Sequence, residues 1–137
     1  MPHLQFEFNF SIKEDEKVNF GKSIMNIFSD IMDTGTGHIG ITIREYSKSN
    51  LLLGRVSDSS EKIAFVNADI REGRVYEKRR KLALAFMDAI NKYFQVPQNN
   101  MYVIFTEHKG EDFHLYERAL KNWAPEEDPL KEDSLND

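Results

Sequence analysis

The sequence predicts an α+β domain in which a β-α-β unit occurs twice, giving a four-stranded mixed sheet with two helices on one face. Three observations predict this fold. Apolar residues alternate along short segments, as they do in strands that bury one face. A long segment with apolar residues at helical spacing follows each of two such strands. The order strand, helix, strand then repeats over units of roughly 45 residues, which indicates a duplicated unit.

The first predicted strand begins at the second residue of the chain. Its apolar positions alternate: Leu4, Phe6, Phe8 and Phe10. Pro2 is tolerated there because proline has no N–H, and the first position of a strand does not need to donate a hydrogen bond to the neighbouring strand. Met1 precedes a small residue and is normally cut off in that context, which would leave Pro2 as a secondary amine. Such an amine can act as a general base if its pKa is brought near neutrality. The alternative is that Pro2 has no chemical role and only starts the strand.

The first helix is predicted from residue 11, where Ser11 and Glu14 have the spacing of a capping box. Its apolar positions have helical spacing: Val18, Ile24, Ile27, Phe28 and Ile31. Residues 34–37, Thr-Gly-Thr-Gly, end it. Residues 38–46 alternate again and predict the second strand.

The second half repeats this plan. Its predicted elements are a nearly continuous apolar strand over 62–70, a turn over 71–74, a helix over 75–94 and a strand over 101–106. Because parallel strands joined by one helix cross over right-handedly, both helices are expected on one sheet face. No further helix is predicted to cover the other face, so we expect an oligomer to cover it.

A single domain is expected over residues 1–123, with its two halves at about 2–50 and 61–107. Residues 108–123 are expected to form a loop and a short helix. Residues 124–137 are rich in Glu, Asp and Pro and are expected to be a disordered acidic tail.

Composition excludes several function classes. The 137 residues include no cysteine, so thiolate chemistry is not available. A net charge of -5 argues against general nucleic-acid binding. The chain shows no apolar run long enough to span a membrane and no signal-peptide pattern, so a cytoplasmic location is expected. Neither a nucleophile elbow, a glycine-rich phosphate loop nor histidines at metal-ligand spacing is present.

Several segments resemble the tautomerase superfamily. They are the opening Met1-Pro2-His3, residues 64–67, Ile70, Gly73-Arg74, Glu77, and the corner at residues 96–103. The opening and central segments are most similar to 5-carboxymethyl-2-hydroxymuconate isomerases. The corner resembles that of macrophage migration inhibitory factor and its relatives. Together these matches cover roughly residues 2 to 116.

The resemblance implies a homotrimeric isomerase of aromatic catabolism that needs neither cofactor nor metal. It would move a proton in a small unsaturated keto or enol acid, with Pro2 as base and then acid and Arg74 holding a carboxylate or polarising the enolate. Arg44 would hold a second carboxylate. Further substrate-binding residues implied by the resemblance are Arg71, Phe65, Tyr102 and Phe113. The isomerases carry an arginine where Thr42 stands here, so either Arg44, two residues on, takes that role or the substrate differs.

An apolar pocket and nearby arginines would both lower the pKa of the Pro2 amine. Phe6, Phe8 and Phe65 are expected to supply the apolar walls of that pocket. Tyr102 and Phe113 either line a neighbouring subunit's pocket or only pack an interface.

Other interpretations remain open. Arg71 and Arg74 can be a structural pair, and Arg44 can simply pair with a glutamate across the sheet. Retention of Met1 would make Pro2 an amide without basicity, which favours a non-catalytic trimeric interaction protein of the same fold. Hydrolytic chemistry needs an acidic residue beside Pro2, and the sequence alone identifies none.

Overall fold

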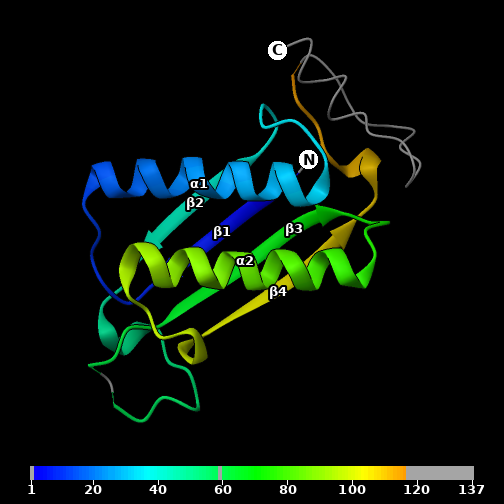
Figure 1. The fold of residues 1–137 in the computed structure, drawn as a ribbon. Coiled ribbons are helices and arrows are strands. Elements are labelled where there is room, and N and C mark those ends of the chain that lie inside the picture. The colour runs from blue at the N-terminus through cyan, green and yellow to red at the C-terminus, as the bar shows by residue number, and fades with distance from the viewer. Residues whose placement is uncertain (1, 59, 117–137) are drawn as a thin grey trace.

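The computed structural model describes residues 2–58 and 60–116, which form one sheet covered on one face by two helices (Figure 1). The elements are β1 (His3–Phe8), α1 (Glu14–Met32), β2 (Gly40–Glu45), β3 (Ala64–Arg71), α2 (Tyr76–Phe94) and β4 (Met101–His108). The strand order is β2-β1-β3-β4. This arrangement confirms the predicted fold class.

The two halves of the chain meet at the centre of the sheet. Strand β1 pairs in parallel with β2, and β3 pairs in parallel with β4, each pair being joined by its own helix. The contact between the halves is the antiparallel pairing of β1 with β3. Both helices lie in front of the strands in Figure 1, as the right-handed crossover predicts.

Aromatic side chains fill the space between the sheet and the helices. From β1, Phe6 and Phe8 are fully buried and meet Phe20 of α1 at ring-centroid distances of 5.1 and 6.1 Å. From α2, Phe86 packs on Phe6 at 5.7 Å and Phe94 packs on Phe8 at 5.3 Å. Edge-to-face contacts of this kind add to the free energy of burying each ring, and they join both helices to the central strand.

The start of α1 differs from the prediction. The N-cap is Lys13, which makes no side-chain cap hydrogen bond, so the expected capping box between Ser11 and Glu14 is wrong. Instead, Glu45 of β2 accepts a hydrogen bond from the backbone N–H of Ile12 at 2.9 Å. Three acidic residues in the first turn still complement the positive end of the helix dipole.

Element ends differ from the prediction by a few residues. Strand β2 is shorter than expected, and β4 continues to His108 instead of ending at Thr106. A short 3-10 helix at Gly110–Asp112 follows β4. The expected domain end at residue 123 and the expected acidic tail 124–137 lie outside the described residues. In the part of the chain that is described, no helix combines the length and apolarity that a membrane crossing requires.

The sheet face opposite the helices carries mainly polar side chains. Given the strand registers, it presents His3, Gln5, Glu7, Thr42, Arg44, Phe65, Asn67, Asp69, Tyr102, Ile104, Thr106 and His108. Within residues 2–58 and 60–116, no helix covers this face (Figure 1). We refer to it below as the open face.

Candidate active site

Pro2 lies at the start of the central strand β1 and is buried. Its carbonyl oxygen accepts a hydrogen bond from the N–H of Gly40 at 3.1 Å, which fixes it to the start of β2. His3 pairs with Asp69 of β3, so continuing the antiparallel register by one residue brings Pro2 level with Ile70. Pro2 therefore lies at the end of the sheet where the last residues of β3 are found. Below, this end of the strands is called the edge at Pro2.

The turn after β3 carries the two predicted arginines to the same edge. Arg71 is the last residue of β3 and is only 4% exposed, and its Nη1 donates to the carbonyl oxygen of Glu72 at 3.4 Å. Gly73 has a φ of 101°, a conformation that glycine adopts readily and other residues adopt only under strain. Arg74 follows it, half-buried, just before α2. The N–H of Glu72 donates to the carbonyl oxygen of His108 at 2.7 Å, which holds this turn against the end of β4.

Phe113 belongs to the same edge because it follows β4. Its ring lies 5.7 Å from that of His108 in an edge-to-face contact. Of the residues predicted for the site, one chain thus brings Pro2, Arg71, Arg74 and Phe113 to one edge of the sheet.

The other three predicted residues lie towards the opposite edge. Arg44 and Phe65 are both in register with Glu7, four residues along β1 from His3, which is about 13 Å of strand. Tyr102 is in register with Phe65, and the two rings stack at 4.6 Å. A single chain therefore does not bring Arg44, Phe65 or Tyr102 next to Pro2.

The predicted apolar walls of the pocket are also divided. Phe6 and Phe8 point to the helices and are fully buried in the core, whereas Phe65 lies on the open face. The expectation that these three rings line one pocket with Pro2 is therefore wrong. The expectation failed because the even-numbered residues of β1, Phe6 and Phe8, point to the core. Phe65 of β3 is in register with Glu7, an odd-numbered residue of β1, and therefore points to the open face.

A diagonal chain of hydrogen bonds crosses the open face, and the sequence did not reveal it. Arg44 Nη1 donates to Gln5 Oε1 at 2.9 Å, and Gln5 Nε2 donates to Asp69 Oδ2 at 2.9 Å. Asp69 Oδ1 lies 3.0 Å from His108 Nε2. This polar chain, consisting of these four residues, links all four strands. Arg44 is bound by the Gln5 amide, so within residues 2–58 and 60–116 the alternative of a pairing with a glutamate across the sheet is not seen.

A second polar contact lies beside this chain. The hydroxyl of Tyr46 donates to Glu7 Oε2 at 2.8 Å. This hydrogen bond to a carboxylate raises the pKa of Tyr46, because it stabilises the protonated phenol. Among the described residues, no group of three or more His, Asp or Glu side chains has the arrangement of a metal site.

The two-layer architecture of four strands and two helices occurs in known structures. No protein-family model and no curated protein sequence matches this chain. Solved structures match it in fold, and the structures named below are members of the tautomerase superfamily.

Three of these structures illustrate the similarity. Macrophage migration inhibitory factor of Toxoplasma gondii has a TM-score of 0.73 at 15% identity, over 85% of this chain and 98% of its own. A fused 4-OT, wild type and a symmetric trimer, has a TM-score of 0.75 at 16% identity, over 87% and 94%. N1, a member of the cis-3-chloroacrylic acid dehalogenase family, has a TM-score of 0.77 at 18% identity, over 97% and 89%. At these identities the likeness establishes a shared fold.

Proposed function

We propose that this protein is a cofactor-independent tautomerase that moves a proton in a small unsaturated keto or enol acid, in the manner of 5-carboxymethyl-2-hydroxymuconate isomerase. The observation that carries the proposal is the position of Pro2. It is buried at the start of the central strand, at the same sheet edge as Arg71 and Arg74. The shared fold with tautomerase-superfamily structures supports it.

The reaction needs one base and a stabiliser of negative charge. The Pro2 amine, freed by removal of Met1, takes a proton from the carbon next to the carbonyl group and returns it to a more distant carbon. An α-amino group ordinarily has a pKa near 8, and burial together with nearby guanidinium groups lowers the pKa of an amine towards neutrality. Arg74 stabilises the dienolate or holds a carboxylate, for which its planar fork is suited. Arg71 and Phe113 complete the binding site at this edge.

A homotrimer would resolve the separation of the predicted site residues. Arg44, Phe65 and Tyr102 lie too far along the strands to reach Pro2 of their own chain. A neighbouring chain can supply them, as the resemblance implies for aromatic residues near Tyr102. The open face, polar and without a covering helix in the described residues, is the surface such an assembly would cover. The fused 4-OT structure cited above is itself a trimer.

The test combines an intact mass of the protein from its native host with an assay of phenylenolpyruvate ketonisation. We expect a chain lacking Met1 that accelerates the reaction. Pro2→Ala should lower kcat by about 10² to 10⁴ and change KM little, since a general base acts on turnover. Pro97→Ala, which changes an exposed proline elsewhere, is the matched control and should retain activity. A chain that retains Met1 and shows no activity would instead favour the non-catalytic trimeric interaction protein.

A second candidate is the addition of water to an unsaturated acid, as in hydrolytic dehalogenation. It is favoured by Asp69, whose carboxylate is in register with the residue after Pro2 and is held by Gln5 and His108. The similarity to N1 of the cis-3-chloroacrylic acid dehalogenase family supports it. Chloride release from cis-3-chloroacrylate, lost in Asp69→Asn, would favour this candidate over the tautomerase.

A further inference from the structure

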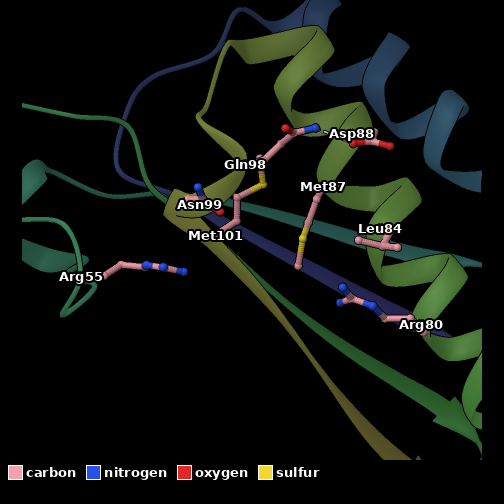
Figure 2. A pocket seen from close by; sticks show the side chains of 8 residues that line it. All are labelled: Arg55, Arg80, Leu84, Met87, Asp88, Gln98, Asn99 and Met101. Atoms are coloured by element: carbon pink, nitrogen blue, oxygen red, sulfur yellow. Dashed lines mark hydrogen bonds between the residues drawn. The ribbon is translucent and has the colours of Figure 1, made fainter.

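We propose that a second site, at the start of β4, binds a small organic monoanion with a hydrocarbon body. The site is a cavity of about 410 Å³ between α2, the 3-10 helix Gln98–Asn100 and the loop that precedes β3 (Figure 2). This volume is within the range of small-molecule sites. The proposed tautomerase reaction does not use it.

Two arginines face this cavity from opposite sides. Arg55 comes from the loop and Arg80 from α2, and Figure 2 shows both guanidinium groups directed towards the space between them. Neither arginine makes a hydrogen bond or an ion pair with any residue of 2–58 or 60–116. Arg79, the neighbour of Arg80, does: its Nη1 binds Glu107 Oε1 at 2.9 Å. The two arginines at the cavity therefore keep their donors available for a ligand.

The floor of the cavity is apolar. Met87 of α2 and Met101 at the start of β4 lie between the arginines in Figure 2, and Leu84 is 43% exposed beside them. Methionine side chains are flexible and polarizable, so they fit ligands of varied shape. Covering an exposed leucine with a hydrocarbon group lowers the free energy, because apolar surface is removed from water. These residues suit the hydrocarbon body of the ligand.

The charge of the site selects a monoanion. Asp88 also lines the cavity, and its carboxylate accepts a hydrogen bond from Gln98 Nε2 at 2.6 Å. Two guanidinium groups against one carboxylate leave a single positive charge. A carboxylate with a chain of several carbons, such as a medium-length fatty acid, matches both this charge and the apolar floor.

The cavity is well separated from Pro2 within one chain. Met101 begins β4, whereas Pro2 is level with Ile70 and so with Glu107 near the end of β4, six residues and about 20 Å of strand away. Ligand binding here can therefore be measured without assaying the proposed reaction, and the two proposals can fail independently.

Calorimetry with octanoate and octan-1-ol tests the proposal on the full chain, because the two probes share a hydrocarbon body and differ in charge. We expect Arg55→Gln and Arg80→Gln each to weaken octanoate binding about tenfold or more and to leave octanol binding unchanged, as for the loss of one charge-assisted hydrogen bond. Lys81→Gln removes the same charge outside the cavity and should have little effect on either probe.

Methyl NMR locates the bound octanoate. The Met87 and Met101 methyl signals should shift on titration, and they should shift equally in the Pro2→Ala variant. The proposal is overturned if octanoate does not bind, if Lys81→Gln weakens binding as much as Arg80→Gln, or if the shifts occur at methionines outside the cavity.

Discussion

Gln5 donates a hydrogen bond to the Asp69 carboxylate over 2.9 Å and accepts one from Arg44 over the same distance. Both ends of its amide are therefore satisfied, which fixes the orientation of the side chain on the open face. Because the other Asp69 oxygen contacts His108, one glutamine joins the first half of the chain to the second.

Replacement of this glutamine tests how much the polar chain stabilises the sheet. Gln5→Ala removes two hydrogen bonds to charged groups, so we expect the free energy of unfolding to fall by about 1 to 3 kcal/mol in urea denaturation. Gln98→Ala is the control, since that exposed side chain makes one hydrogen bond, to Asp88, and should cost less than about 0.5 kcal/mol. Equal losses in the two variants would contradict a structural role for the polar chain.

Because of Glu45, the free energy of unfolding is expected to decrease at acidic pH. Its pKa is lowered from the ordinary value of 4.5, first by the hydrogen bond from Lys17 and also by the N–H of Ile12. A carboxylate with a lowered pKa stabilises the fold above its unfolded pKa, and this contribution is lost as the pH falls through its folded pKa. Glu45→Gln should therefore cost about 1 kcal/mol at pH 7, with the difference from wild type vanishing well below pH 4.5.

Glu14 provides the control for this pH dependence. It also pairs with Lys17, at 3.2 Å, but its side chain is 92% exposed. Because solvent screens such a pair, Glu14→Gln should change the unfolding free energy at pH 7 by much less than Glu45→Gln. A pH profile that is the same for both variants would show that Glu45 has no special role.

Gly73 should control the position of Arg74. At a φ of 101°, an alanine would be strained, so Gly73→Ala should lower the unfolding free energy by about 1 to 3 kcal/mol. If Arg74 holds a substrate carboxylate, the displaced turn should also raise KM in the ketonisation assay. Gly54→Ala is the matched control: a Cβ there meets nothing within 4 Å, so stability and KM should stay near wild type. A Gly73→Ala enzyme with unchanged KM would argue against substrate binding by Arg74.

Gly21 offers a substitution that should stabilise the protein. It lies in the interior of α1, and a Cβ added there meets no atom within 4 Å. Alanine has a higher helix propensity than glycine, so Gly21→Ala should raise the unfolding free energy by about 0.5 to 1 kcal/mol, measured by thermal or urea denaturation. A lower stability than wild type would contradict the expected gain from helix propensity at this open position.

The fold was predictable because local patterns determine it. Leu4, Phe6 and Phe8 alternate along β1, and these side chains are fully buried under the helices. The start of α1 was not predictable in detail, since the acceptor for Ile12 comes from Glu45, 33 residues further along the chain. A pattern within one segment cannot reveal a partner contributed by another strand.

The candidate site shows the same division. Pro2 and the Arg71–Arg74 turn could be proposed for the site because each is a short sequence feature. The contact of Gln5 with Asp69 spans 64 residues and depends on the register between β1 and β3, which packing decides. The same register carries Arg44 and Phe65 away from Pro2, a separation that no spacing in the sequence indicates.

The antiparallel ladder between β1 and β3 is the only strand pairing that joins the two halves within the described residues. Each half closes its own parallel pair, so the segment between β2 and β3 serves as a tether and not as part of either ladder. A chain cut in this tether would leave two fragments that can still recognise each other through six residue pairs and a shared aromatic core. The same pairing can form between halves of different chains, so the ladder makes the protein a natural candidate for split-protein reassembly and for exchange of halves during refolding at high concentration.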